Sequence, residues 1–154
     1  MSVELAIREA RYTDAAALDA LLAECGLSSH GVLAPATRYW LAERGGQVIG
    51  AVGLEYGAGA VLLRSAAVRP AARGQGLGAA LLWWALDQAR AGGYQRIYLF
   101  STGAGAFWSR QGFRQVPVPE LVAALPDAPQ VRHYDEQGSL PDEVAWRKDL
   151  DGGR

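Results

Sequence analysis

The chain has 154 residues, and its 15 Lys or Arg nearly balance its 16 Asp or Glu, so the formal net charge is −1. Half of the residues are apolar and a fifth are charged, which predicts a folded core rather than a disordered chain. The balanced charge lacks the basic excess of proteins held on nucleic acid or anionic lipid, so the expected partner is a small molecule. The one cysteine, Cys25, and the lack of a Cys/His set with zinc spacing predict neither disulfide nor metal.

The length predicts one domain over residues 1–150, followed by a disordered tail at residues 151–154. The longest purely apolar run, Ala79 to Leu86, has 8 residues, far fewer than the roughly 20 that cross a bilayer. The N-terminus also lacks a basic region followed by an apolar one. We therefore expect a cytoplasmic protein without a membrane anchor.

The N-terminal part of the chain reads as strand, helix and loop. Apolar residues alternate with other residues at Val3, Leu5 and Ile7, which is typical of a strand with one buried face. Thr13 or Asp14 is expected to cap a helix that ends near Glu24. This helix places leucines on one side, at Leu18, Leu21 and Leu22. Residues 27–37 have no clean period and are expected to be a loop or a short helix.

The middle of the chain is typical of three antiparallel strands joined by glycine turns. The expected strands are Tyr39 to Arg44, Val48 to Tyr56 and Val61 to Val68. Pro70 blocks extension of the third strand, and a long helix is expected over Leu77 to Ala91.

The rest of the chain is expected to hold short elements and a long loop. The predicted elements are a strand at Ile97 to Phe100, a helix at Gly105 to Arg110, a strand at Phe113 to Val116 and a closing strand around Val144 to Arg147. Five of the seven prolines lie between Pro117 and Pro141, which predicts a loop-rich segment there.

A glycine-rich loop, Arg73-Gly74-Gln75-Gly76-Leu77-Gly78, stands between the third strand and the long helix. A helix N-terminus has backbone N–H groups without intrahelical partners and carries partial positive charge. Because glycines let a ligand approach the main chain closely, the loop is a candidate pyrophosphate cradle, with Arg73 adding a charge-assisted contact. The alternative is a turn that only packs helix against strand.

Two other phosphate ligands fit this loop less well. Gly74, Gly76 and Ala79 satisfy the dinucleotide fingerprint, but that motif requires a parallel βαβ unit, and the preceding strands read as antiparallel hairpins. A nucleotide-binding Walker loop requires a following Gly-Lys-Ser/Thr, which is missing here. Dinucleotide binding remains an alternative that saturable NAD(H) binding would reveal.

Two segments at the right separation resemble the GCN5-related N-acetyltransferases, the GNAT family. Arg73-x-x-Gly76-x-Gly78 is similar to the acyl-CoA signature of the family, and the segment from Phe107 to Phe113 is similar to its aromatic-x-x-x-Gly-Phe stretch. The resemblance implies an α+β fold with a mixed, mostly antiparallel sheet of six or seven strands and helices on both faces. It also implies an acyl-CoA cleft between splayed strands 4 and 5.

A finer likeness concerns acetyltransferases encoded in arsenic-resistance operons. The segments Gly53-Leu54-Glu55-Tyr56 and Leu62-Leu63-Arg64-Ser65 resemble that group, whereas Ser139-Leu140-Pro141 departs from its usual Cys-Pro pairing.

The resemblance implies an N-acetyltransferase that uses acetyl-CoA as co-substrate and acetylates a primary amine by direct attack in a ternary complex. The main chain of Ala66, Ala67 and Val68 would contact pantetheine, and an N–H near Val68 would polarise the thioester carbonyl. The pyrophosphate would be bound by Arg73, Gly74, Gln75, Gly76, Leu77, Gly78 and Ala79.

The proton transfers have several candidate residues. The family often places a tyrosine that protonates the CoA sulfur at the position of Trp108, whose N–H is no useful acid at neutral pH. Trp108 would still lie beside the cofactor. Solvent, Tyr56 or Tyr134 would then protonate the thiolate, or the protein is a CoA-binding sensor or interaction module with little turnover. Glu55 is the candidate base, and the alternative is a solvated carboxylate paired with Arg64.

The acceptor is expected to be a small amino-acid-like amine, because no acidic cleft for polyamines or basic protein tails is visible. The candidate acceptor-binding residues are His30 and Arg64, and the planar guanidinium of Arg64 suits a carboxylate. His133 is a weaker candidate.

Of the two tryptophans in the long helix, one is expected on the core face and the other on the opposite face; they are Trp83 and Trp84. Another element of the chain, or a second subunit in a homodimer, would cover that opposite face.

Overall fold

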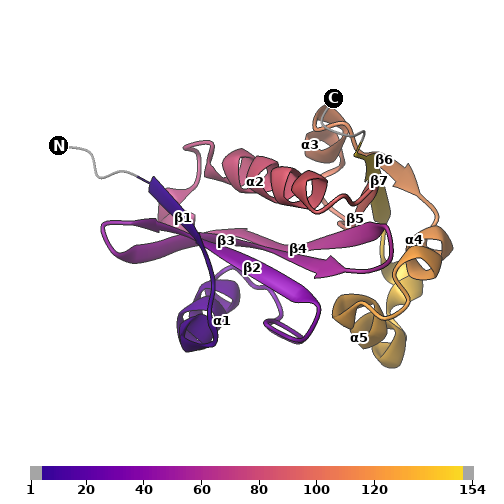
Figure 1. Cartoon of the computed structure of the whole chain (residues 1–154), viewed down its shortest axis with the longest axis horizontal. Helices are drawn as coiled ribbons and strands as arrows, with labels where there is room; N and C mark the ends of the chain where they lie inside the picture. Colours follow the sequence, from indigo (N-terminus) through magenta and orange to yellow (C-terminus); the bar gives the residue numbers. More distant parts are fainter. Residues whose placement is uncertain (1–4, 151–154) are drawn as a thin grey trace. The chain divides into compact units, whose positions relative to one another are not determined.

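Seven strands form one sheet in the computed structural model, which describes residues 5–150 (Figure 1). Val3 and the tail predicted at residues 151–154 lie outside the described residues. The strand order is β1-β2-β3-β4-β5-β7-β6. β4 and β5 run parallel, whereas β1 and β2, β5 and β7, and β6 and β7 pair antiparallel. The predicted mixed, mostly antiparallel sheet is confirmed.

The strands are β1 Leu5–Glu9, β2 Thr37–Arg44, β3 Gln47–Tyr56, β4 Ala60–Val68, β5 Arg96–Phe100, β6 Arg114–Val116 and β7 Ala145–Asp149. The helices are α1 Ala15–Glu24, α2 Leu77–Ala91, α3 Gly105–Arg110, α4 Val118–Ala124 and α5 Pro129–Gln137. Three short 3-10 helices cover Tyr12–Asp14, Pro70–Ala72 and Leu140–Asp142. No helix in this described part is both long and apolar enough to cross a membrane.

The chain groups into two compact units. The first contains Met1–Leu54 and Ser65–Ala85, and the second contains Glu55–Arg64 and Leu86–Arg154. β3, β4 and α2 therefore contribute residues to both units.

In the first unit, α1 and the beginning of α2 lie on opposite sides of the strands (Figure 1). The predicted leucine side of α1 packs against four residues of β2, β3 and β4, namely Tyr39, Leu41, Ala51 and Ala67. On the other side, a Cβ built on Gly50 would lie 3.0 Å from a methyl group of Leu81 in α2. Gly50 therefore lets α2 approach β3 closely. Each fully buried leucine contributes about 1.5–3 kcal/mol of hydrophobic stabilisation.

In the second unit, α4 and α5 cover part of the sheet. Leu121 of α4, Leu125 directly after it and Val131 of α5 share one apolar cluster with Leu62 of β4 and Tyr98 of β5. Tyr98 also donates a hydrogen bond from its hydroxyl to Glu120 of α4, at 2.9 Å. This helical layer is inserted between β6 and β7 in the chain.

The prediction of a loop-rich segment between Pro117 and Pro141 is wrong, because most of this segment is helical. A proline occupies the first turn of α4, of α5 and of the short helix Leu140–Asp142. The proline ring sets φ near −65°, and the first helical residue needs no N–H partner, so proline begins a helix as readily as it ends one.

Two local expectations at the N-terminus also differ from the structure. β1 is an edge strand, and Leu5 is 36% exposed, so its alternation does not produce a well-buried face. Asp14 stands at the N-cap of α1 but makes no capping hydrogen bond there. Its carboxylate instead accepts hydrogen bonds from the guanidinium of Arg8 and the main-chain N–H of Arg11.

Candidate active site

The C-terminal half of β4 contains a break in its extended backbone. Ser65 has a φ of +57°, which side chains other than glycine rarely adopt. After this residue, Ala66 is exposed and Ala67 is buried. Left-handed residues within strands reorient the following main chain. The three residues predicted to contact pantetheine, Ala66, Ala67 and Val68, therefore follow a locally redirected segment.

Two donors hold the carbonyl group at the end of β4. The oxygen of Val68 accepts hydrogen bonds from Nε of Arg73, at 3.0 Å, and from Sγ of Cys25, at 3.4 Å. The first of these contacts holds the guanidinium beside the glycine loop. The terminal nitrogens of Arg73 make no hydrogen bond or ion pair within residues 5–150.

Two glycines of the glycine loop adopt the left-handed backbone conformation. Gly74 and Gly76 have φ values of +81° and +77°, and a Cβ at either residue would have no neighbour within 4 Å. The space beside both residues is therefore open. The main-chain N–H of Ala80 donates to the carbonyl of Gly76, at 3.1 Å, as the first turn of α2 forms. The main-chain N–H groups of the residues just before Ala80 belong to the first turn of the helix, where a helix offers no internal acceptors.

Gln75 and Gly78 fix the edges of this loop. The amide oxygen of Gln75 accepts a hydrogen bond from Arg44 of β2, at 2.8 Å, so the side chain is anchored to the sheet. A Cβ on Gly78 would lie 3.9 Å from the side chain of Val68. Leu77 is buried and Ala79 is half-buried. The three glycines of the loop are exposed, as are Arg73 and Gln75.

Glu55 and Arg64, both in the second unit, form a buried ion pair. Oε2 of Glu55 lies 2.9 Å from Nη1 of Arg64, and the exposed fractions of the side chains are 0% and 3%. The other carboxylate oxygen accepts a hydrogen bond from the main-chain N–H of Gln130, at 3.0 Å, in the first turn of α5. The pairing with Arg64 that the sequence analysis gave as the alternative to a base is present, but the carboxylate of Glu55 is buried and not solvated. The insertion of α5 between β6 and β7 supplies the donor from Gln130 next to this pair.

Gln130 and Tyr134 extend this group along α5. Nε2 of Gln130 donates to the hydroxyl of Tyr134, at 3.2 Å, and the ring of Tyr134 packs edge-on against Phe100 of β5. Burial raises the pKa of Tyr134 above its usual value, and the charge of Glu143 adds to this effect. Gln130 is not predicted from the sequence, because the surrounding prolines are also typical of a loop. Pro129 at the first helical position was the available signal.

Trp108 lies in α3, between two other aromatic residues. Its ring packs edge-on against Phe107 and Phe113, at centroid distances of 4.9 and 5.5 Å. The indole N–H of Trp108 is buried without a hydrogen-bond partner among the described residues. A buried donor of this kind is costly unless a ligand or water accepts from it.

The remaining predicted residues lie in separate places. Tyr56 ends β3, with its ring 5.1 Å from that of Tyr94 in the second unit. His30 is exposed in the loop between α1 and β2, where its main-chain N–H donates a hydrogen bond to the hydroxyl of Ser28. Within residues 5–150, no three His, Cys, Asp or Glu side chains cluster in a way that could hold a metal ion.

Comparisons with known proteins place this fold. The family model described as "Acetyltransferase (GNAT) family" matches residues 4–113. A solved N-acetylglutamate synthase from Neisseria gonorrhoeae, complexed with coenzyme A and N-acetyl-glutamate, is 22% identical with a TM-score of 0.76. The match covers 97% of this chain and 36% of that one, so the chain spans about a third of the length of the synthase.

Two smaller proteins match over nearly their whole length. A GNAT-family acetyltransferase from Staphylococcus aureus Mu50 is 18% identical, has a TM-score of 0.74, and aligns over 96% of this chain and 100% of its own. The protein Rv2747 of Mycobacterium tuberculosis, solved in complex with CoA, is 21% identical, has a TM-score of 0.72, and aligns over 94% and 99%. A search of curated proteins finds no significant match to this sequence. Because the family model covers more than half of the residues, the chain belongs to the GNAT family of acetyltransferases.

Proposed function

We propose that this chain is an N-acetyltransferase that moves the acetyl group of acetyl-CoA to the primary amine of a small, amino-acid-like molecule. The observation that carries the proposal is the open glycine loop at the start of α2, in a chain of the GNAT family. Solved neighbours in complex with CoA support the choice of co-substrate. The N-acetyl-glutamate in the Neisseria gonorrhoeae structure supports an amino-acid-like acceptor.

The main chain of the first unit would bind the cofactor. The pyrophosphate would accept hydrogen bonds from N–H groups of the glycine loop and from the terminal nitrogens of Arg73. The main chain of Ala66, Ala67 and Val68, after the left-handed Ser65, would bind pantetheine and polarise the thioester carbonyl. Trp108 would donate its buried N–H to the cofactor or to bound water.

The reaction would begin with attack of the neutral amine nitrogen on the acetyl carbon. The C–N bond forms, the C–S bond breaks, the nitrogen loses one proton and the CoA thiolate gains one. The products are an N-acetylated amine and free CoA. Because Trp108 is no acid at neutral pH, solvent, Tyr56 or Tyr134 would protonate the thiolate.

The buried pair of Glu55 and Arg64 supports positioning roles for both residues. Both carboxylate oxygens of Glu55 accept hydrogen bonds, and its side chain is not exposed to solvent. The pair therefore joins β3 and β4 to the first turn of α5. In this arrangement Glu55 holds α5 in place, and a base role would require the pair to open.

Isothermal titration with acetyl-CoA tests the cofactor site. Gly76→Asp places bulk and negative charge where the pyrophosphate would lie, so we expect acetyl-CoA binding to be lost. Gly59→Asp is the matched control, because Gly59 has a φ of +74° and open space beside it in the turn between β3 and β4. Equal affinity of both variants would contradict the cradle, and NADH should give no saturable binding.

A second candidate function is a CoA-binding sensor or interaction module with little turnover, favoured by Trp108 at the position of the usual acid. Thiol release measured over a panel of amines separates the two functions. Release that depends on the amine supports the enzyme, and CoA binding without release supports the module.

The predicted homodimer and cytoplasmic location stay predictions. Analytical ultracentrifugation tests the homodimer, for which Trp83 of α2, 63% exposed, is the candidate contact.

A further inference from the structure

The parallel pairing of β4 with β5, in the second unit, ends before β5 does. The last pair of this ladder joins Leu62 to Tyr98. Among the described residues, Leu99 and Phe100 at the end of β5 pair with β7 and not with β4. In sheets with parallel strands, ligands bind outside the carboxyl ends of those strands. The end of β5 is therefore the place in the second unit where an acceptor is expected.

Glu143 stands directly beyond this end of β5. The pairing of β5 with β7 continues past both strands, because the N–H of Ser101 donates to the carbonyl of Val144, at 2.9 Å. Glu143 precedes Val144, and its own N–H donates to the carbonyl of Leu140, at 3.1 Å. Main-chain hydrogen bonds on both sides thus fix the position of Glu143 in the chain.

The carboxylate of Glu143 has no cation to neutralise it. Its side chain makes no ion pair and no hydrogen bond with the part of the chain that the structure describes, and the residue is half-buried. Burial raises the pKa of this carboxyl above its usual value, and the charge of Asp142 adds to the effect. A partly desolvated carboxylate without a partner is costly, and it is typical of groups that bind a cation or accept a proton.

Tyr134 of α5 lies within electrostatic reach of Glu143. Burial raises the pKa of Tyr134, and the charge of Glu143 is the next cause. The ring of Tyr134 packs against Phe100, with 5.2 Å between the ring centroids. Its hydroxyl accepts a hydrogen bond from Gln130, so its O–H proton is not used in that contact. Two groups that can exchange protons with a ligand therefore lie near the end of β5.

The charges on the two neighbouring strands act on this place less. Arg64 of β4 lowers the pKa of Tyr134 and Glu55 of β3 raises it, and these two residues form a buried ion pair with each other. Both carboxylate oxygens of Glu55 accept hydrogen bonds, from Arg64 and from the N–H of Gln130. Glu55 is thus occupied, whereas Glu143 is not.

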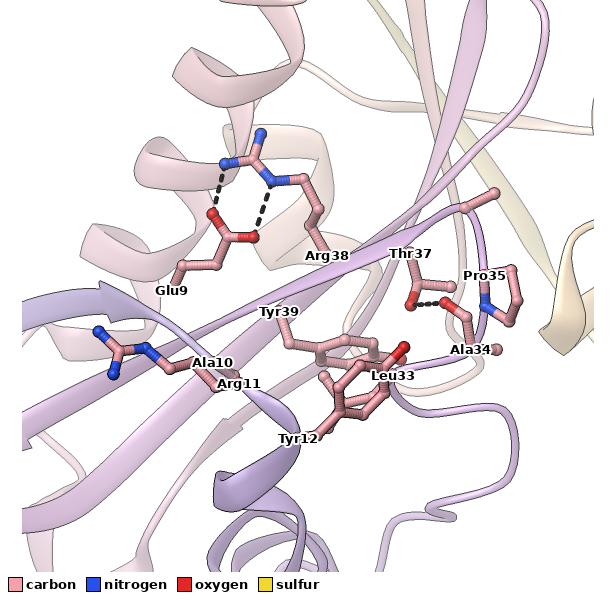
Figure 2. A pocket seen from close by; sticks show the side chains of 11 residues that line it. Glu9, Ala10, Arg11, Tyr12, Leu33, Ala34, Pro35, Thr37, Arg38 and Tyr39 are labelled. Carbon is pink, nitrogen blue, oxygen red and sulfur yellow. Dashed lines mark hydrogen bonds and ion pairs between the residues drawn. The ribbon is translucent and has the colours of Figure 1, made fainter.

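A cavity of the first unit offers no free carboxylate either. It has a volume of about 300 Å³ and is lined in part by Arg11, Tyr12 and Tyr39 (Figure 2). Glu9 is the only carboxylate of its lining, and it accepts two hydrogen bonds from Arg38, at 2.7 and 3.2 Å. An amine in this cavity would find no carboxylate in the lining that is ready to accept its proton.

We infer that Glu143 is the catalytic base of the proposed transferase, and that its carboxylate accepts a hydrogen bond from the acceptor amine and takes the proton that the nitrogen loses. This inference rests on the proposed function. It assigns two different roles to two glutamates of the second unit: Glu55 holds α5 in place, and Glu143 acts on the acceptor.

The proton moves because the acidity of the nitrogen changes during the reaction. A neutral amine is a very weak acid, but its nitrogen becomes strongly acidic as the C–N bond to the acetyl carbon forms. One N–H proton then passes to the carboxylate of Glu143. The C–S bond breaks, its electron pair stays on sulfur, and the thiolate takes a proton from solvent or a tyrosine. Glu143 returns its proton to water after the product leaves.

Steady-state thiol release over a range of pH tests this assignment. The amines are L-glutamate, L-phenylalanine and O-methylhydroxylamine, and the last carries no charge at neutral pH. We expect Glu143→Gln to lower kcat/KM about 100- to 10,000-fold, with an unchanged KM for acetyl-CoA. Wild type should lose activity as pH falls through the pKa of Glu143. This acidic limb should be missing in Glu143→Gln.

Two exposed carboxylates provide the controls. Glu136→Gln is the same substitution at an exposed residue of α5, and it should leave all kinetic constants unchanged. Asp142→Asn removes the charge beside Glu143, so it should move the acidic limb to lower pH without loss of activity at neutral pH. Full activity of Glu143→Gln, or an acidic limb that persists in this variant, would overturn the assignment while the transferase remains. Loss of acetyl-CoA binding in Glu143→Gln would also overturn it, in favour of a structural role.

Direct binding separates this inference from the proposed function. L-glutamate and L-phenylalanine are titrated into protein saturated with CoA, with wild type and Glu143→Gln compared. Both amines are protonated at neutral pH and would pair with the carboxylate, so the variant should bind them about tenfold more weakly. Binding that requires Glu143, in a protein that acetylates no amine, would support the contact with the amine and contradict the transferase. Absence of both binding and transfer would overturn both.

Discussion

Glu55 and Arg64 face each other across neighbouring strands with their charges removed from water. Oε2 and Nη1 are 2.9 Å apart, and Gln130 at the start of α5 donates to the second carboxylate oxygen. Removal of one partner leaves the other charge buried and unpaired, which is more costly than the loss of the hydrogen bond itself. The pair therefore couples the sheet of the second unit to its inserted helix.

Single substitutions in this pair should destabilise the protein more than the double substitution. We expect Glu55→Leu or Arg64→Met to lower the free energy of unfolding by about 3–5 kcal/mol, whereas the double variant should lose less than either single one. Urea denaturation of the four proteins measures the coupling free energy. Additive losses would show that the two charges do not depend on each other.

The backbone at Ser65 should control acetyl-CoA binding. Ser65→Gly removes side-chain strain at a φ of +57°, so it should retain acetyl-CoA affinity. Ser65→Val introduces a β-branched residue that does not adopt this conformation, and should lower affinity about tenfold or more by straightening the strand. Isothermal titration measures both variants, with Ser65→Ala as the intermediate. A valine variant with normal affinity would show that the left-handed residue is not needed.

The carboxylate of Asp14 should make stability depend on pH in acid. Hydrogen bonds from Arg8 and from the N–H of Arg11 lower the pKa of Asp14 from 3.8 to about 2. A lowered pKa in the folded state stabilises the fold above the unfolded value, and this contribution is lost as pH falls through the folded value. The stability difference between wild type and Asp14→Asn should therefore shrink between about pH 4 and pH 2.

Urea midpoints at several pH values measure this effect. Asp87→Asn is the control, because the side chain of Asp87 is 78% exposed on α2. A constant difference between wild type and Asp14→Asn over the whole range would contradict the assigned cause.

Trp108 should contribute to cofactor affinity and not to proton transfer. Trp108→Phe keeps an aromatic ring between Phe107 and Phe113 but removes the buried N–H. We expect a several-fold higher KM for acetyl-CoA and an unchanged alkaline limb of the profile of kcat against pH. A shifted or missing limb would assign Trp108 a part in the proton transfer.

Tyr134→Phe and Tyr56→Phe, measured in the same way, test the two tyrosines as the acid. If solvent protonates the thiolate, both variants should keep kcat within about twofold of wild type. A large loss in one of them, without a change in KM, would identify it as the proton donor.

Most of the fold could be predicted from local patterns along the chain. The predicted bounds of helix α2 and helix α3 agree with the structure, and for α2 the glycines at its C-terminus and its apolar spacing are the signals. The turn at Gly45 and Gly46 followed in the same way, and both residues have a positive φ. The helices α4 and α5 were missed, because proline is compatible with a loop and with a first helical turn, and only packing selects between them.

The sequence by itself determined the glycine loop and its likeness to an acyl-CoA signature, because phosphate binding by main-chain groups depends on residues that are close together in the chain. Only the tertiary structure decided that Glu55 is fully buried and accepts a hydrogen bond from Gln130, since Gln130 is 75 residues away in sequence and α5 brings it to the sheet. The same holds for the cavity between Arg11, Tyr12 and Tyr39, which exists because the loop before β2 folds back beside the end of β1. Spacing along the chain shows periodic faces and local turns, whereas burial and the pairing of distant charges depend on how those faces pack.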